Sequence, residues 1–171
     1  MMKLLTISDD SGFIGIANFH QYQSFVASNW DFDMIKQHII GQSNLNRILF
    51  WATYHEEDWR VKIVDEATDT AAFSEFRGFL EVSDRRLYLC NYETLTLAAQ
   101  FEDVKLPEVH LSDLYIELKN GKYGVKIRQM YNPENYKREE LAFDFEIVIQ
   151  EIKKNVDIYH NRFDQLPWSK W

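Results

Sequence analysis

The amino-acid sequence predicts a mainly β protein, either an antiparallel β-sandwich or a twisted sheet with one or two short helices, with an α+β arrangement as the alternative. Many short segments alternate or concentrate apolar residues over the length of a strand. The chain is also rich in aromatic residues, with 12 Phe, 9 Tyr and 5 Trp, and these favour strands. At 171 residues and 46% hydrophobic, it has the size of one domain, expected to span residues 1–171.

The first elements expected are a hairpin and a short helix. Residues 3–19 read as two strands, "KLLTIS" and "FIGIANF", around the polar turn "DDSG". Met34, Ile35, His38 and Ile39 then follow helical spacing. Asp31 or Asp33 is the expected N-cap and Gly41 the expected end, which predicts a helix of about nine residues.

The middle of the chain predicts four strands and one further helix. The continuous apolar run "RILFWATYH" (47–55) is typical of a central strand covered on both faces. An acidic hairpin loop and the alternating strand "DWRVKIVDE" (58–66) follow it. Residues 76–92 read as two strands around the turn 83–86, and "ETLTLAAQFED" (93–103) as one or two helical turns before Leu106-Pro107.

The segment "IELKNGKYGVKI" (116–127) has the features of a β-hairpin. Asn120-Gly121 is the dipeptide that favours a type I′ turn. The resulting register pairs Leu118 with Tyr123 and Ile116 with Val125, all on one face.

The C-terminal segment fits two structures. "LAFDFEIVIQ" (141–150) alternates as a strand does, but its apolar residues also match a helix face. The density of Phe and β-branched residues favours a strand to about residue 151, with a helix or tail beyond it. Trp168 and Trp171 are expected either to dock back on the sheet or to bind another chain.

Charge and composition narrow the functional classes. The net charge is −8, and acidic residues are concentrated in turns of the first two thirds of the chain. This field disfavours nucleic acid and anionic membranes and favours a basic protein partner. The chain shows no signal-peptide pattern and no membrane span, and the lone Cys90 fits a reducing cytoplasm.

The sequence offers three candidate catalytic groups, His55, His110 and Cys90. His55 lies beside three acidic residues in "YHEEDW", a set that could hold a metal or act as an acid–base pair, but no second His lies at metal-ligand spacing. His110 is three residues from Asp113. Cys90 alternates with apolar residues on a strand, as an inert core thiol does. No nucleotide-binding or hydrolase motif occurs, so no cofactor and no metal are expected.

Residues 76–130 carry a resemblance to known proteins. The strands of "FLEVSDRRLYLCNYETL" and "LYIELKNGKYGVKI", with Gly121 and Tyr123 after the last turn, resemble small bacterial β-sandwich proteins of the competence protein J and toxin-immunity type. The insertion "ETLTLAAQFED" and a longer C-terminal segment depart from that group. The resemblance implies a β-sandwich that inhibits a nuclease or neutralises a toxin, and it assigns no functional residue.

The leading hypothesis is therefore a non-enzymatic immunity or inhibitor protein that neutralises a basic toxin or nuclease through an acidic surface. One alternative is a small enzyme or ligand-binding protein with a pocket around His55 or His110. The other is a homo-oligomeric structural protein, paired through a strand edge or through Trp168 and Trp171. For the leading hypothesis the predicted contact residues are Glu56, Glu57, Asp58, Trp59, Asp65, Glu66 and Asp69.

Overall fold

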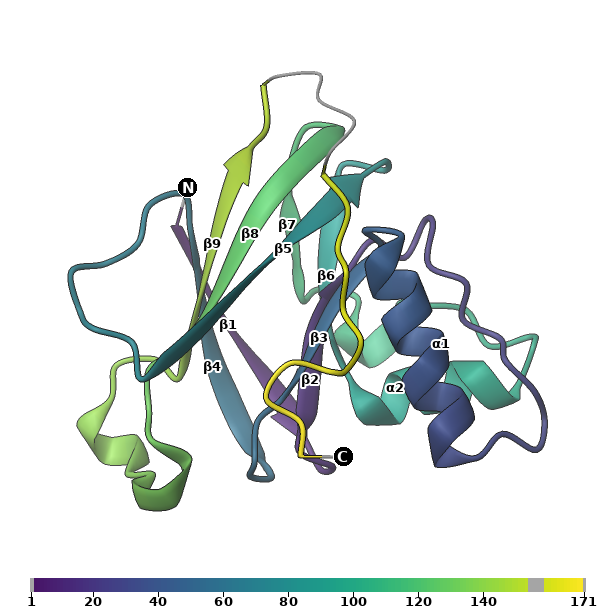
Figure 1. Cartoon of the computed structure of the whole chain (residues 1–171), viewed down its shortest axis with the longest axis horizontal. Coiled ribbons are helices and arrows are strands. Elements are labelled where there is room, and N and C mark those ends of the chain that lie inside the picture. Colours follow the sequence, from purple (N-terminus) through teal and green to yellow (C-terminus); the bar gives the residue numbers. More distant parts are fainter. Residues whose placement is uncertain (1, 154–158, 171) are drawn as a thin grey trace.

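The computed structural model describes residues 2–153 and 159–170, and it is mainly β, as predicted. The described residues form nine strands in two sheets, with two α-helices beside them (Figure 1). Three short 3-10 helices lie in the connections, at Val109–Leu111, Pro133–Asn135 and Arg138–Glu140. Within the described residues, neither α-helix has the length and apolar character needed to cross a membrane.

The larger sheet has five strands in the order β1-β4-β9-β8-β5. Its neighbouring strands are antiparallel except β4 and β9, which run parallel. The last strand of the chain, β9, therefore lies at the centre of this sheet. The five strands are β1 (Met2–Asp9), β4 (Glu57–Val64), β5 (Ser74–Val82), β8 (Gly121–Gln129) and β9 (Phe145–Glu151).

The smaller sheet is antiparallel and packs between the larger sheet and the helices. Its order is β3-β2-β6-β7, and both helices cover its outer face (Figure 1). One core cluster fills the space between the sheets, and a second fills the space between the smaller sheet and the helices. The elements are β2 (Phe13–Ala17), α1 (Phe32–Asn44), β3 (Ile48–Ala52), β6 (Arg86–Asn91), α2 (Tyr92–Gln100) and β7 (Tyr115–Glu117).

The tightest turns are corners between the sheets. The connections β1 to β2, β3 to β4, β5 to β6 and β7 to β8 each join a strand of one sheet to a strand of the other. The hairpins predicted for residues 3–19, for the loop before residue 58 and for residues 116–127 are therefore wrong. Strands with one apolar face satisfy the pattern equally well when that face packs against an opposing sheet.

The segment 116–127 shows this most clearly. Ile116 pairs with Leu87 in the smaller sheet, whereas Val125 lies between Gly78 and Ile149 in the larger one. Among the described non-glycine residues, positive φ occurs at four positions, and Asn120 is not one of them, so the turn is not type I′. The Asn120 side chain instead accepts a hydrogen bond from the backbone N–H of Arg85, at 2.8 Å, which joins the two neighbouring corners.

Both predicted helices are present, but α1 ends later than predicted. Asp31 is the N-cap of α1, and its Oδ1 accepts a hydrogen bond from Met34 N at 2.9 Å. Gly41 lies inside α1 instead of ending it, and the helix continues to Asn44. Helix α2 starts after the cap Asn91, where a helix was expected.

Strand β3 is buried on both faces, as predicted, but it is an edge strand and not a central one. The C-terminal tail covers its end, where Ala52 N donates to Pro167 O at 3.1 Å. Residues 159–170 form no helix, and Trp168 docks back against Phe76 at 5.0 Å between ring centroids. Residues 154–158 and Trp171, on which other C-terminal predictions fell, lie outside the described residues.

Three asparagines fix this tail to the body of the protein. Asn161 donates to the carbonyl oxygens of Phe79 and Ser43, at 2.9 and 2.7 Å, and accepts from Phe79 N at 2.7 Å. Asn46 donates to Tyr159 O at 2.6 Å, and Asn44 bonds both the N–H and the carbonyl of Phe163. Residues 159–170 are thus held beside β5 by these hydrogen bonds.

Two glycines should respond oppositely to replacement by alanine. A Cβ at Gly15 would lie 2.7 Å from the Leu49 carbonyl oxygen, a backbone atom that cannot move aside cheaply, so Gly15→Ala should lower the free energy of unfolding by about 2–3 kcal/mol. A Cβ at Gly41 meets nothing within 4 Å, so Gly41→Ala should raise it by up to about 1 kcal/mol through helix propensity. Urea denaturation measures both, and equal effects would contradict this packing.

Candidate functional site

The structure gathers two acidic turns at one end of the molecule. The register of β1 and β4 places Asp9 opposite Glu57 and Ser8 opposite Asp58. The turn after β1 therefore lies beside the turn before β4, at the lower end of the view in Figure 1. We call the acidic side chains that reach the surface here the acidic corner, which consists of the exposed Asp10, Glu56 and Asp58 and the half-buried Glu57.

A buried carboxylate organises this corner. Asp9 is only 1% exposed, and both of its oxygens are fully engaged. Its Oδ1 accepts three backbone N–H groups of the β1–β2 turn at 2.8–3.1 Å, and its Oδ2 accepts from Thr53 Oγ1 and Trp59 Nε1 at 2.8 and 3.0 Å. One side chain thus ties together the two corners that carry the acidic residues.

The four side chains of the acidic corner differ in their exposure and in the bonds that they form. Asp10, Glu56 and Asp58 are exposed, and Asp58 accepts a hydrogen bond from Ser8 Oγ. Glu57 is half-buried and forms an ion pair with Arg138. The corner therefore presents negative charge from a rigid backbone, which limits the entropy lost when a partner binds.

The other predicted acidic group lies elsewhere. Asp65, Glu66 and Asp69 are exposed in the loop after β4. Because β4 runs for eight residues, this loop begins about 23 Å from the acidic corner. The structure thus brings residues 56–58 together with Asp10 and separates them from residues 65–69.

The loop 65–73 is anchored by a buried ion pair. Arg128 is 7% exposed and Glu146 is 0% exposed, and the two are in contact on the larger sheet. Arg128 also donates to the carbonyl oxygens of Thr68 and Thr70, and Glu146 accepts from Thr68 N at 3.2 Å. The pair was not predicted, because charged residues that alternate with apolar ones along a strand are typical of a solvent-facing side.

A second ion pair, between Arg60 and Asp144, supports the acidic corner and was not predicted from the sequence either. Arg60 donates to both oxygens of the fully buried Asp144, at 3.0 and 2.9 Å, and these hydrogen bonds raise the pKa of Arg60. Its guanidinium also donates to the carbonyl oxygen of Arg138 at 3.1 Å. Arg60 therefore helps to place the backbone of the residue whose side chain pairs with Glu57.

Trp59 was predicted at the contact surface, but it is fully buried. Its ring stacks on Tyr131 at 5.1 Å between centroids, and its N–H bonds Asp9. It cannot touch a partner, so its role is to position the corner.

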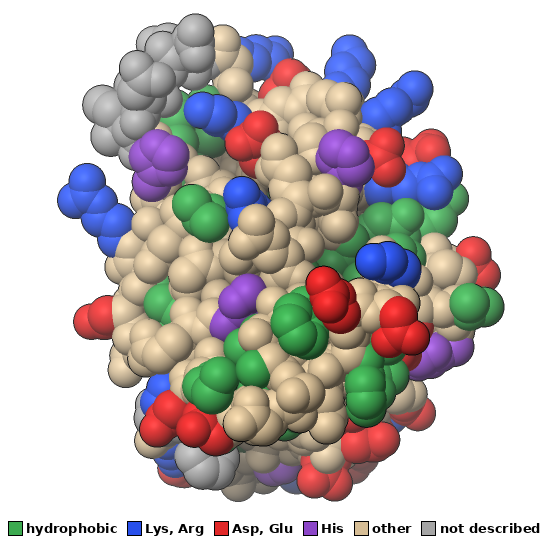
Figure 2. All heavy atoms as spheres, turned by 90° about the vertical axis from the view of Figure 1, so that its right-hand side faces the viewer, with side chains coloured by type: hydrophobic (Ala, Val, Ile, Leu, Met, Phe, Trp, Pro, Cys, Tyr) green, Lys and Arg blue, Asp and Glu red, His purple; other side chains and the backbone are tan. Residues whose placement is uncertain are grey.

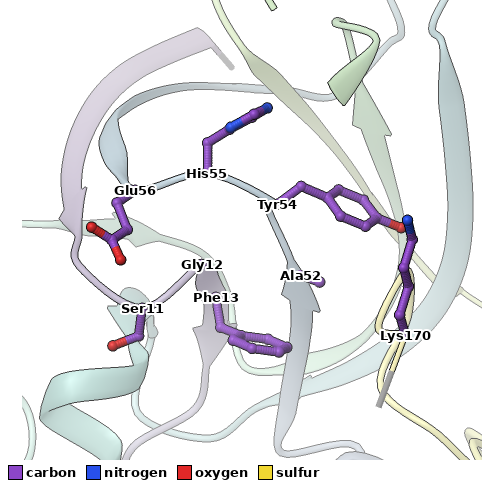
Figure 3. Close-up of a pocket in the computed structure, with 8 residues that line it drawn as sticks. All are labelled: Ser11, Gly12, Phe13, Ala52, Tyr54, His55, Glu56 and Lys170. Atoms are coloured by element: carbon purple, nitrogen blue, oxygen red, sulfur yellow. The ribbon is translucent and has the colours of Figure 1, made fainter. Parts of the chain in front are cut away.

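His55 lines a shallow pocket of about 270 Å³, but its ring is engaged elsewhere. Figure 3 shows the imidazole pointing away from Phe13 and Ala52, on the far side of the pocket. Nε2 donates to the Pro133 carbonyl oxygen at 2.7 Å, and the ring stacks on Tyr136 at 5.6 Å. This geometry gives an acid–base role in the pocket no support.

The remaining chemical candidates are isolated. His110 is exposed, and its Nδ1 lies 3.4 Å from Glu108 Oε2. Burial raises the pKa of the Cys90 thiol far above its usual range, so it stays protonated. Within residues 2–153 and 159–170, no group of three or more His, Cys, Asp or Glu side chains is arranged to hold a metal ion.

Figure 2 shows how charge is distributed over the face that carries the helices. Acidic side chains are frequent at its lower end, whereas Lys and Arg side chains lie mostly at its upper end, interspersed there with further acidic ones. The lower end is the one where β1 turns into β2 (Figure 1). The acidic corner thus lies at the end of the molecule where acidic side chains are frequent on this face.

Comparisons with known proteins identify two solved structures of similar fold. No family model matches the sequence, and no curated protein matches it. Two solved structures are similar in shape. One, described as crocagin biosynthetic gene J, has a TM-score of 0.53 and 13% identity, over 88% of this chain and 95% of that one. The other is ComJ from Bacillus subtilis, an inhibitor of the DNA-degrading activity of NucA, with a TM-score of 0.52 and 9% identity, over 89% of this chain and 99% of that one. At these identities the likeness concerns the fold, and the chain has a ComJ-like fold, as its resemblance predicted.

Proposed function

We propose that this protein is a non-enzymatic inhibitor, of the immunity type, that covers the anion-binding surface of a basic nuclease or toxin with its acidic corner. The observation that carries this proposal is the convergence of two acidic turns on one backbone framework, organised by Asp9. Nucleases hold phosphate groups with Lys and Arg side chains, and a rigid array of carboxylates can occupy the same positions.

The structural neighbours support the class of function and leave the partner open. ComJ inhibits a DNA-degrading enzyme, which agrees with a nuclease as the target. The other neighbour belongs to a biosynthetic gene set, so this fold alone does not fix the role. The charge of the acidic corner is what favours inhibition here. The net charge of −8 adds long-range attraction for a basic protein.

Reversing charge at the acidic corner should weaken inhibition. In the double variant Asp10→Lys, Glu56→Lys, two exposed carboxylates become ammonium groups, while Glu57 and Asp58 keep their bonds to Arg138 and Ser8. We expect the association rate with the basic partner to fall at least tenfold at low salt, with a flatter salt dependence. The measurement is the rate at which each variant suppresses the DNA-degrading activity of the partner that the wild-type protein captures from its host, at low and at high salt.

The matched control is Glu66→Lys, Asp69→Lys, which changes net charge equally at exposed positions of the distant loop. This variant should slow association about threefold or less. Equal effects of the two pairs would show that only net charge matters, and unaltered inhibition by the first pair would remove the acidic corner from the interface. If the wild-type protein captures no basic enzyme and inhibits no nuclease, the inhibitor proposal fails.

A further inference from the structure

The edges of the two sheets differ in how far they are closed. At the β5 edge of the larger sheet, Phe79 N donates to the side chain of Asn161 at 2.7 Å. At the β3 edge of the smaller sheet, Ala52 N donates to Pro167 O at 3.1 Å. The other edge of the smaller sheet, β7, is three residues long. The other edge of the larger sheet is β1, an eight-residue strand whose single neighbour among the described strands is β4.

The direction of the β1 backbone groups follows from the contacts of β4. Thr6 lies opposite Arg60 in the register of the two strands. The N–H and the carbonyl oxygen of Arg60 both bond Asp144, on the side of β9, at 2.8 and 2.9 Å. Thr6 and Arg60 are therefore a non-hydrogen-bonded pair, so the N–H and carbonyl of Thr6 point away from β4. Because these directions alternate along a strand, the backbone groups of Leu4 point to the same side.

A side-chain hydrogen bond marks where the open part of β1 ends. The amide of Asn91, at the end of β6, donates to the Ser8 carbonyl oxygen at 2.9 Å. Outside the ladder with β4, the described residues offer no hydrogen bond to the N–H groups of Leu4 and Thr6 or to the carbonyl oxygens of Met2, Leu4 and Thr6. We call residues Met2–Thr6 the open stretch.

The outward side chains of the open stretch have none of the features that commonly protect an edge. Met2 and Leu4 are exposed to 77% and 58%, and Thr6 is exposed. None of the three is charged, the stretch contains no proline, and the register with β4 runs from Met2 to Asp9 without a bulge. Unpaired N–H and C=O groups along such an edge attract another strand. The chemistry of this edge therefore selects a β-strand as its occupant.

The charge of Lys3 does not oppose the addition of a strand. Its side chain points to the inner side of β1, where the ammonium donates to the Tyr115 carbonyl oxygen. The ammonium also lies 4.8 Å from the centroid of the Tyr115 ring. Lys3 already has its partners within the chain, so pairing at the edge leaves these contacts in place.

We propose that β1 pairs with β1 of a second copy of this chain, antiparallel and about a two-fold axis. The two five-stranded sheets then form one continuous sheet of ten strands. Leu4 lies at the axis opposite Leu4 of the second copy, and Met2 lies opposite its Thr6, so the open N–H and carbonyl groups bond each other. The exposed Met2 and Leu4 side chains of both copies join into one apolar strip that leaves water.

The charges around the edge fit this arrangement. The outward positions of the open stretch carry no charge that would select a foreign strand, whereas the stretch matches a copy of itself. Antiparallel pairing sets the two acidic corners, with Asp10 and Asp58, at opposite ends of the joined strands, and parallel pairing would set these like charges side by side. Lys62, opposite Leu4 on β4, lies three strand spacings from its equivalent, about 14 Å, which exceeds the Debye length of about 8–10 Å.

The dimer is expected to be weak and to leave both acidic corners exposed. The paired residues end at Thr6, before Ser8 and Asp58. Pairing over five residues buries less surface than the roughly 800 Å² per partner of stable complexes, so we expect a dissociation constant of about 0.1 mM. This inference does not depend on the inhibitor proposal, because it involves neither the acidic corner nor the captured enzyme.

The test is sedimentation equilibrium of the full chain from about 10 µM to about 1 mM, with amide hydrogen exchange measured at both concentrations. We expect mostly monomer at the lower concentration and mostly dimer at the higher. The amides of Leu4 and Thr6 should exchange about fivefold more slowly at the higher concentration, where about a fifth of the chains remain monomeric. The amides of Leu5 and Ile7 point toward β4 and should be protected at both concentrations.

The matched variants are Leu4→Lys and Leu45→Lys, which make the same change at leucines that are 58% and 54% exposed. Leu4→Lys places two like charges opposite each other at the axis, so dimerisation should weaken at least tenfold, with the midpoint of urea denaturation unchanged. Leu45→Lys, at the end of α1, should leave dimerisation within about twofold of the wild type. A chain that stays monomeric at about 1 mM overturns the inference. So does a dimer that tolerates Leu4→Lys or leaves the exchange of the Leu4 and Thr6 amides unchanged, because it uses another surface.

Discussion

Replacing Asp9 by alanine is expected to lower the free energy of unfolding by about 4 kcal/mol. The side chain is 1% exposed and accepts hydrogen bonds from five donors, three of them backbone N–H groups. Each donor left unsatisfied in a buried site costs about 1–3 kcal/mol, part of which relaxation and water recover. Urea denaturation followed by tryptophan fluorescence measures the loss.

Two further variants sharpen this prediction. Asp9→Asn keeps the acceptor for the backbone N–H groups but turns an amide N–H toward the Trp59 N–H, so it should cost about half as much. Asp10→Ala removes an exposed neighbour and should stay within about 0.5 kcal/mol of the wild type. If Asp9→Ala is as mild as Asp10→Ala, Asp9 does not organise the corner.

Replacing Glu146 by alanine is expected to lower the free energy of unfolding by about 3–5 kcal/mol. The change leaves the guanidinium of Arg128 buried beside an empty site, and an uncompensated buried charge is costly. Glu75 lies 3.6 Å from Arg128 Nε, but its carboxylate is half-exposed and compensates only weakly. Urea denaturation again gives the magnitude.

The double variant Arg128→Met, Glu146→Leu separates the charge from the packing. It removes both ions together, so it should recover most of the stability that Glu146→Ala alone loses. It should also speed proteolysis within residues 65–73, because Arg128 and Glu146 hold the backbone of Thr68 and Thr70. A double variant as unstable as the sum of its single variants would rule out coupling between the two charges.

The sequence correctly indicated where most strands lie, but it did not indicate which strands pair with one another. Alternation correctly placed strands near residues 57–64, 74–82 and 145–151, because each has one face in the core between the sheets. The same alternation cannot say which strand lies alongside. Asn120-Gly121 favours a hairpin locally, but burial of Ile116 and Val125 in different sheets determined the outcome.

The candidate site was predictable in part for a similar reason. The clustering of Glu56, Glu57 and Asp58 is a local property of the sequence. Their meeting with Asp10 depends on the register of β1 and β4, strands that are some fifty residues apart in the chain. The single-domain extent over residues 1–171 and the oligomeric state stay predictions.

The position of β9 has a consequence for synthesis of the protein. This strand separates β4 from β8, so the larger sheet cannot be joined until residue 151 is available. All eight other described strands are synthesised before β9, and at about 5–20 residues per second the stretch from β8 to the end of β9 takes about one to several seconds. The larger sheet is therefore expected to form only after β9 has left the ribosome, with the edges of the earlier strands open to chaperones in the meantime.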